Sequence, residues 1–190
     1  MRLIQERIRQ ASHDTSHGII QVDSFLNHQV DPVLIQAIGD EFAHRLRETQ
    51  PTKILTVETG GIAPALVAAL TLHLPLIIAR KRRATGMPRE LLQESTLSQT
   101  KNRPIDLFVS PQYLGPQDRV VIIDDFLTHA QVMLALCRLV ESGGAQVVGI
   151  GVVIEKALEG GREALASLDV PIEALIRIGK IETNTIEFLD

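Results

Sequence analysis

Two adjacent carboxylates, Asp124 and Asp125, directly follow a run of branched aliphatic residues at 120–123. Such a run is typical of a buried strand in a parallel sheet. In open α/β sheets the ligand crevice lies beyond the carboxyl ends of the strands, so we expect both carboxylates to face a ligand. There they can accept hydrogen bonds from sugar hydroxyls or bind water molecules on Mg²⁺. From these two residues alone, the alternative that Asp125 caps a turn and Asp124 is solvated is equally open.

A helix expected after the acid pair adds a possible anion site. Apolar residues at helical spacing predict this helix over residues 131–142, and Gly143 and Gly144 end it. Its N-terminus would point at the same crevice, where the backbone N–H groups of residues 128–132 would attract an anion. A phosphate beside two carboxylates indicates a phosphorylated sugar as the ligand.

A second possible anion site lies at a glycine pair that follows another short apolar run. Gly60 and Gly61 let the backbone approach a ligand closely, and a helix is expected directly after them, over residues 62–72. Arg80 and Lys81 follow a further expected strand and offer positive counter-charge. Taken alone, a glycine pair is more often only a tight strand-to-helix turn, and a basic run can be a solvated surface.

The hydrophobic pattern indicates the fold class. Short branched-apolar runs alternate with amphipathic stretches, as in strands joined by crossover helices, so we expect an α/β fold with a mostly parallel central sheet flanked by helices. The absence of an internal repeat or obvious linker indicates a single domain over residues 1–190. The expected strands are 53–58, 74–79, 119–125, 147–155 and 172–178, and the expected helices are 31–48, 62–72, 131–142 and 161–168.

Composition excludes several classes of protein. The chain is 45% hydrophobic and 22% charged, which is ordinary for a globular domain, and its net charge of −4 argues against nonspecific binding to nucleic acid. The single cysteine, Cys137, cannot form an intrachain disulfide. No apolar run approaches the ~20 residues that a membrane span requires. We therefore expect a cytoplasmic protein with no nucleic-acid or membrane partner.

Taken together, these motifs resemble those of the type I phosphoribosyltransferases. The acidic strand end marks the wider family, whereas SFLNHQ and VIEK point to its xanthine-using branch. The resemblance implies the family's fold, with a small hood of N-terminal and C-terminal segments and a flexible lid at residues 82–101. The matching segments are VDSFLNHQVDP at 22–32, ETGGIAPA at 58–65, IARK at 78–81, VVIIDDFL at 120–127 and GIGVVIEKA at 149–157.

The resemblance also implies a reaction. Such an enzyme transfers ribose 5-phosphate from 5-phosphoribosyl 1-pyrophosphate (PRPP), bound with Mg²⁺, to xanthine, giving xanthosine 5′-monophosphate and pyrophosphate. The transition state has oxocarbenium character, so the protein positions two substrates and stabilises charge without a covalent nucleophile. A homodimer is implied as well. Two alternatives stay open: a preference for guanine or hypoxanthine, and a regulator that senses PRPP without turning it over.

Individual residues take roles from this resemblance. Asp124 and Asp125 would be the catalytic residues and would bind the ribose hydroxyls. For the base, Lys156 and Asn27 would donate to the two exocyclic oxygens and Ile20 would pack against the ring, within a hood to which residues 1–30 contribute. The 5′-phosphate would bind at Thr128, His129, Ala130, Gln131 and Val132, and the pyrophosphate at Thr59, Gly60, Gly61, Arg80 and Lys81.

One position departs from the family's pattern. The phosphate loop is expected to read Ala-Asn-Gly-Gln-Ala, and Ala130 stands where that pattern has glycine. Glycine allows close backbone approach or a positive φ, whereas alanine adds a Cβ that would crowd the phosphate. A negative φ at Ala130 would leave the loop intact, and a positive φ would lower the affinity for PRPP.

Overall fold

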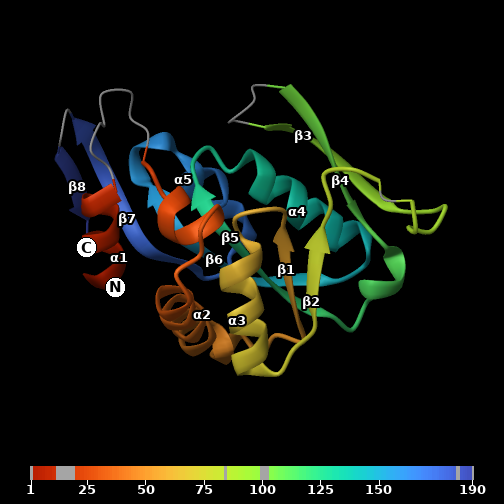
Figure 1. The fold of residues 1–190 in the computed structure, drawn as a ribbon. Helices are drawn as coiled ribbons and strands as arrows, with labels where there is room; N and C mark the ends of the chain where they lie inside the picture. Colours follow the sequence, from red (N-terminus) through yellow and green to blue (C-terminus); the bar gives the residue numbers. More distant parts are fainter. Residues whose placement is uncertain (1, 12–19, 84, 99–102, 183–184, 190) are drawn as a thin grey trace.

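A six-stranded sheet forms the centre of the computed structural model, which describes residues 2–11, 20–83, 85–98, 103–182 and 185–189. The strand order is β2-β1-β5-β6-β7-β8, in which neighbouring strands run parallel except for the antiparallel pair β7 and β8 (Figure 1). This architecture confirms the expected α/β fold. The strands are β1 (Lys53–Val57), β2 (Leu76–Ala79), β5 (Arg119–Leu127), β6 (Gln146–Lys156), β7 (Ile172–Glu182) and β8 (Thr185–Leu189).

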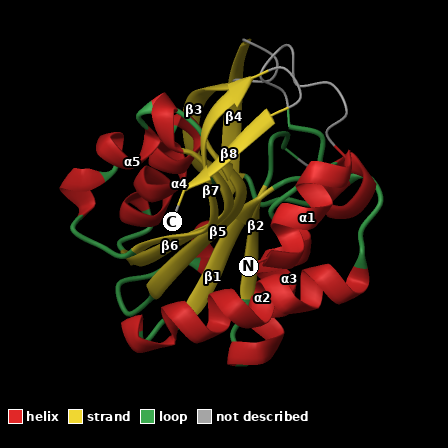
Figure 2. Ribbon diagram, turned by 90° about the vertical axis from the view of Figure 1, so that its left-hand side faces the viewer, coloured by secondary structure: helices red, strands yellow, loops and turns green. Residues whose placement is uncertain are grey.

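Helices cover both faces of the sheet (Figure 2). They are α1 (Arg2–Ala11), α2 (Pro32–Leu46), α3 (Ile62–Leu72), α4 (Gln131–Ser142) and the short α5 (Gly161–Ala164). A π-helical turn lies at Asp23–Asn27, and 3₁₀ turns lie at Arg47–Thr49, Pro111–Tyr113, Ala157–Glu159 and Ala166–Leu168. None of the helices in the described ranges is long and apolar enough to cross a lipid bilayer.

Alternation along β5 divides the core in two, because successive strand residues point to opposite faces of a sheet. Val121 and Ile123 pack with α2 and α3 in a first core cluster. Val120 and Ile122 pack with α4 in a second core cluster on the other face. Both sides of the central strand are therefore buried, which explains its uninterrupted apolar run.

The start of α2 shows how local sequence fixes one helix. Asp31 accepts hydrogen bonds from the backbone N–H groups of Val33 and Leu34, at 3.1 and 3.2 Å, and Pro32 is the first helical residue. An aspartate cap followed by proline is a favoured helix start. The helix expected at 31–48 is thereby confirmed to within two residues at its C-terminal end.

A two-stranded antiparallel hairpin, β3 (Leu92–Ser98) with β4 (Arg103–Val109), forms a second sheet, which two backbone hydrogen bonds between Phe108 and Arg80 join to the end of β2. Strand β3 lies within the stretch interpreted as a lid, where the sequence analysis expected no strand. Residues 84 and 99–101 of that stretch lie outside the described residues. The hairpin contacts α4 through an ion pair of 2.7 Å between Arg138 Nε and Glu94 Oε2, so it packs beside the helix that follows the acid pair.

The first helix and the last strand, neither of which was expected, pack against each other. Ile4 and Ile8 of α1 are fully buried in the first core cluster, against which Phe188 of β8 also packs. The Arg9 guanidinium lies 4.8 Å from the centre of the Phe188 ring, in a cation–π contact. The two ends of the chain therefore form one structural unit at the β8 edge of the sheet (Figure 1).

Candidate active site

The acid pair lies where β5 has lost one of its two neighbours. Strand β5 pairs with β1 only as far as Ile122, opposite Leu55, whereas its pairing with β6 continues to Leu127. Asp124 and Asp125 therefore follow the last residue that β1 covers. The strand extends two residues beyond the expected range of 119–125. This one-sided end of β5, at the carboxyl edge of a parallel sheet, is where a ligand can reach the two carboxylates.

Asp124 is the more buried carboxyl of the pair. It is 7% exposed, and its Oδ1 accepts a hydrogen bond of 2.9 Å from the backbone N–H of Asp125. Burial and the neighbouring Asp125 charge raise the pKa of Asp124 well above its ordinary value, although that backbone bond and the positive charge of Lys81 oppose this rise. Ionising Asp124 therefore requires compensating groups that a bound ligand can supply.

The glycine pair and the acid pair lie directly against each other. A Cβ on Gly60 would be 1.8 Å from Asp125 Oδ2, and a Cβ on Gly61 would be 2.8 Å from Asp124 Oδ1. Any side chain at these two positions would displace a carboxylate, so both glycines are required for the close approach. The structure thus brings together two motifs that are more than 60 residues apart in the sequence. Thr59 precedes the pair and is exposed.

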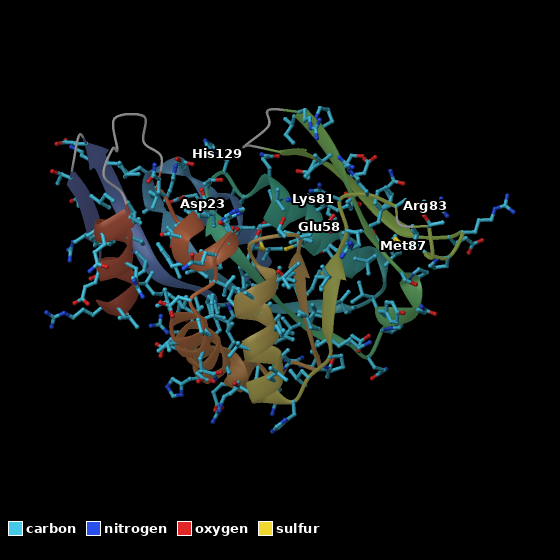
Figure 3. The ribbon with its side chains drawn as sticks, viewed as in Figure 1. Asp23, Glu58, Lys81, Arg83, Met87 and His129 are labelled. Atoms are coloured by element: carbon cyan, nitrogen blue, oxygen red, sulfur yellow. The ribbon has the colours of Figure 1, made fainter. Side chains whose placement is uncertain are left out.

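Glu58, which the sequence analysis did not single out, positions the basic residues of the neighbouring strand end. Its Oε1 accepts a hydrogen bond of 2.6 Å from the backbone N–H of Lys81, whose side chain is labelled beside it in Figure 3. Its Oε2 lies 3.1 Å from Arg80 Nε. Both expected cations are thereby placed next to the glycine loop. In the sequence, the signal that could have identified Glu58 was its position in the segment ETGG, directly after a buried strand.

The phosphate loop has a left-handed backbone at Ala130, the alternative that was expected to lower the affinity for PRPP. Helix α4 begins at Gln131 as expected, but Ala130 has φ +60° and ψ +7°, so the negative φ that would leave the loop intact is not observed. A left-handed alanine costs roughly 1–2 kcal/mol. Its methyl is 4% exposed and belongs to the second core cluster, so the expected crowding of a phosphate does not follow from its position.

Two further residues near the phosphate loop were missed. A Cβ on Gly161 would be 2.1 Å from the carbonyl oxygen of Thr128, so the start of α5 packs directly on the loop. Glu159 links two expected site residues: its Oε2 lies 3.5 Å from His129 Nδ1, and its Oε1 lies 3.3 Å from Lys156 Nζ. The phosphate loop and the end of β6 are thus connected through one carboxylate.

A cavity of about 470 Å³ opens beside Lys156, between the 157–159 turn and the end of β7. This volume lies in the range of small-molecule sites. Two residues expected at the base do not line it: Asn27 is exposed at the end of the π-helical turn, and Ile20 is 7% exposed within the first core cluster. Their contacts with a base stay predictions.

The acid pair fits a Mg²⁺ ion whose other ligands are substrate phosphates and water. Among the described residues, no group of three or more His, Cys, Asp or Glu could bind a metal ion. Mg²⁺ is usually bound through one or two carboxylates together with substrate phosphates and water. Two adjacent carboxylates next to the loop expected to bind an anion suit this kind of site.

Comparison with known proteins is consistent with this geometry. Residues 29–171 match the family model described as phosphoribosyl transferase domain. Xanthine phosphoribosyltransferase of Listeria monocytogenes is 42% identical over 190 residues, covering 100% of this chain and 99% of the relative. Xanthine phosphoribosyltransferase of Moorella thermoacetica is 43% identical over 190 residues, covering 100% of this chain and 97% of the relative.

Solved structures share the fold at lower identity. Adenine phosphoribosyltransferase from Thermoanaerobacter pseudethanolicus superposes with a TM-score of 0.72 at 22% identity, covering 90% of this chain and 98% of the other. The enzyme of the same name from Trypanosoma brucei, in complex with AMP, pyrophosphate and ribose-5-phosphate, has a TM-score of 0.74 at 19% identity, covering 92% and 79%. The resemblance stated from the sequence motifs is confirmed: this chain belongs to the phosphoribosyltransferase family.

Proposed function

We propose that this chain transfers ribose 5-phosphate from PRPP to xanthine, forming xanthosine 5′-monophosphate and releasing pyrophosphate. The observation that carries the choice of base is the identity of 42% and 43%, over the full chain, with two bacterial xanthine phosphoribosyltransferases. The reaction type is supported by the arrangement of an acid pair, a glycine loop and a helix N-terminus at one end of β5.

On the sugar side, the backbone N–H groups of residues 128–132 bind the 5′-phosphate at the start of α4. Asp124 and Asp125 accept hydrogen bonds from the ribose hydroxyls. These contacts place the anomeric carbon between the departing pyrophosphate and the incoming base. The fixed carboxylates also stabilise the positive charge that develops on the ribose ring in the transition state.

The pyrophosphate leaves toward the loop of Thr59, Gly60 and Gly61. Arg80 and Lys81, which Glu58 positions, provide positive charge beside that loop. Mg²⁺ bound with PRPP would neutralise part of the negative charge on the pyrophosphate oxygens. The positive charge around this loop therefore stabilises the departing pyrophosphate, and no covalent intermediate is required.

On the base side, Lys156 and Asn27 donate to the two exocyclic oxygens of xanthine, and Ile20 packs against the ring within a hood to which residues 1–30 contribute. A purine that lacks one of these oxygens would leave a donor unpaired, which disfavours its binding. The cavity beside Lys156 supports this assignment on one side of the base.

The stretch 82–101 closes over the site as part of the single domain. Strand β3 lies within this stretch, and its Thr96 Oγ1 donates a hydrogen bond of 3.0 Å to the carbonyl oxygen of Gln131. A lid that contacts the start of α4 can respond to phosphate binding and exclude water from a reactive intermediate.

We further propose a homodimer. Leu66 and Leu70 lie four residues apart on α3 and are 48% and 64% exposed, so they form an apolar stripe that a second copy can cover. Sedimentation velocity of the wild type and of Leu70→Glu tests this stripe. A dimer that persists in the variant would exclude it as the interface. The cytoplasmic location expected from the sequence also stays a prediction.

The deciding experiment measures pyrophosphate release by purified protein with PRPP, Mg²⁺ and each of xanthine, guanine and hypoxanthine. The largest kcat/KM is expected with xanthine. A larger value with guanine or hypoxanthine would reassign the base. PRPP binding in calorimetry without turnover of any of the three would instead indicate a sensor.

A further inference from the structure

Two buried hydroxyls of the described residues have no hydrogen-bond partner, Thr56 Oγ1 and Ser110 Oγ. Thr56 is fully buried and lies on β1, whereas Ser110 is 5% exposed and follows β4. Leaving a buried hydroxyl unpaired costs free energy of folding, so a buried polar group without a partner requires an explanation. Only Thr56 lies next to the acid pair.

Thr56 and Asp124 both lie close to one point at the glycine loop. The position that a Cβ would take on Gly61 is 2.4 Å from Thr56 Oγ1 and 2.8 Å from Asp124 Oδ1. Thr56 also directly follows Leu55, the last residue of β1 that pairs with β5. The pairing of β1 with β5 therefore ends next to these side chains, and the missing side chain of Gly61 leaves the space beside both oxygens open.

We propose that Thr56 is a positioning residue for the transfer reaction: when PRPP binds, its hydroxyl donates a hydrogen bond to Asp124 Oδ1. This inference rests on the proposed function of the acid pair. Asp124 Oδ1 already accepts the N–H of Asp125 and has a second lone pair for this bond. With Oδ1 fixed by two donors, Asp124 Oδ2 is oriented to accept from a ribose hydroxyl.

The surroundings of Thr56 make a purely structural role a poor explanation. Its neighbours on β1 are Ile54, Leu55 and Val57, all buried, so the strand is otherwise built from branched apolar residues. Valine has nearly the shape of threonine and would fill the same space without a buried hydroxyl. The fold alone would therefore be more stable with valine at position 56.

Three variants separate the two explanations: Thr56→Val removes only the hydroxyl, Thr56→Ser retains it, and Ser110→Ala removes the other unpaired hydroxyl away from the acid pair. Each protein is assayed for its melting temperature, for its affinity for PRPP with Mg²⁺ by calorimetry, and for kcat and KM with xanthine. We expect Thr56→Val to melt no lower than the wild type and to bind PRPP about tenfold more weakly, as for a lost hydrogen bond to a charged group.

The other two variants are expected to retain PRPP binding. Thr56→Ser should bind PRPP within about threefold of the wild type, because it still has the donor. Ser110→Ala should change only the melting temperature. The KM for xanthine should stay unchanged in all three variants, because Thr56 orients a carboxylate on the side of the site that binds the sugar.

Several results would overturn the inference. Wild-type affinity for PRPP and wild-type kcat in Thr56→Val would show that the hydroxyl has no role. An equal loss in Thr56→Ser and Thr56→Val would show that the methyl group matters instead. Absence of xanthine turnover by the wild type contradicts the proposed function but not this inference, which the PRPP affinities then decide. A wild type that does not bind PRPP would overturn both.

Discussion

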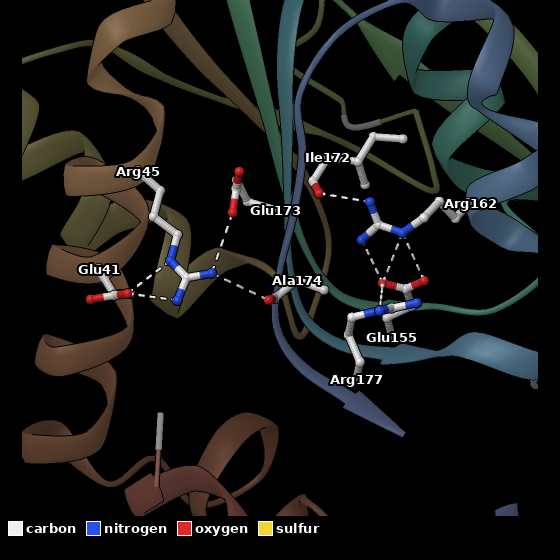
Figure 4. A network of polar contacts seen from close by, with 8 residues as sticks. All are labelled: Glu41, Arg45, Glu155, Arg162, Ile172, Glu173, Ala174 and Arg177. Carbon is white, nitrogen blue, oxygen red and sulfur yellow. Dashed lines mark hydrogen bonds and ion pairs between the residues drawn. The ribbon is translucent and has the colours of Figure 1, made fainter. Parts of the chain in front are cut away.

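Arg162 donates hydrogen bonds to both carboxylate oxygens of Glu155, with Nε–Oε1 at 3.0 Å and Nη2–Oε2 at 2.6 Å (Figure 4). Arg177 Nε adds a third contact at 3.2 Å to Oε2. Glu155 is 2% exposed and immediately precedes Lys156, so this network fixes the end of β6 that carries the proposed base donor.

Replacing this carboxylate should destabilise the protein strongly. Glu155→Gln removes the charge that compensates two guanidinium groups at a buried position, and we expect a loss of about 3 kcal/mol in the free energy of unfolding. Glu173→Gln is the matched control, because Glu173 pairs with Arg45 at 3.3 Å on a half-exposed surface and should cost about 1 kcal/mol or less. Urea unfolding measures both, and equal losses would contradict the expectation.

The pH dependence of stability should reveal the unusual environment of Asp124. Because its pKa is raised in the folded protein, chiefly by burial, Asp124 contributes stability only while it stays protonated. Asp124→Asn should therefore melt higher than the wild type at neutral pH. The difference should shrink as the pH falls toward the ordinary value of 3.8, below which Asp124 is protonated in both states. A constant difference across this range would contradict the burial of the carboxyl.

Asp118 provides a control, because its pKa is shifted in the direction opposite to that of Asp124. Its partial burial raises its pKa, but hydrogen bonds from Lys53 and from the Gly115 backbone outweigh this effect and lower the pKa below the ordinary value. The ionised form therefore stabilises the fold above pH 3.8, and this contribution is lost as the pH falls through the lowered pKa. Asp118→Asn should melt lower than the wild type at neutral pH, with a smaller difference in acid.

Position 130 should tolerate glycine and reject branched side chains. Ala130→Gly relieves the left-handed backbone but loses a buried methyl, two effects of about 1 kcal/mol that oppose each other, so its melting temperature should change little. Its KM for PRPP should be equal to or below that of the wild type. Ala130→Val should melt lower and raise this KM at least about tenfold, because a β-branched residue is strained at positive φ.

A control for this series is Asp169, which also has a positive φ, of +51°, and follows a 3₁₀ turn outside the phosphate loop. Asp169→Val should lower the melting temperature without changing the KM for PRPP. If it raised that KM as much as Ala130→Val does, the effect at position 130 would reflect general instability instead of the phosphate loop.

Removing the proposed hydrogen-bond donor to the base should weaken the binding of xanthine but not that of PRPP. Lys156→Met leaves one exocyclic oxygen of xanthine unpaired, so we expect the KM for xanthine to rise about 100-fold while PRPP affinity changes little. Lys53→Met is the control, because Lys53 pairs with Asp118 at the opposite end of β1. Steady-state kinetics measure both variants. An equal rise of the KM for xanthine and of the KM for PRPP in Lys156→Met would contradict a role limited to binding the base.

The sequence predicted the elements that have one strong physical signal. The branched run before Asp124 and the glycine stop at Gly143 defined β5 and α4 because burial on both faces and helix termination leave local patterns. Strand β3 was missed because LQESTLS is largely polar and packs only one face against the rest of the chain. Its pairing with β4 is a tertiary property that no local pattern records.

The candidate site was predictable in its parts but not in its contacts. The motif that contains Gly61 was found from the sequence, yet nothing local indicated that Gly61 lies between Thr56 and Asp124. Glu58 and Glu159 were missed because an acidic residue at a strand end or in a turn is usually solvated. The φ of Ala130 was left open between two alternatives, because no local pattern fixes it and alanine rarely adopts the positive value that the structure has.

The contact between Arg9 and Phe188 has a consequence for how this protein matures in the cell. Ile4 and Ile8 are synthesised long before Phe188, and they cannot complete their packing until β8 has left the ribosome. At about 5–20 residues per second, the interval is roughly 10–40 s. We expect α1 to leave these two isoleucines uncovered during that time, and exposed apolar surface of this kind is what chaperones bind.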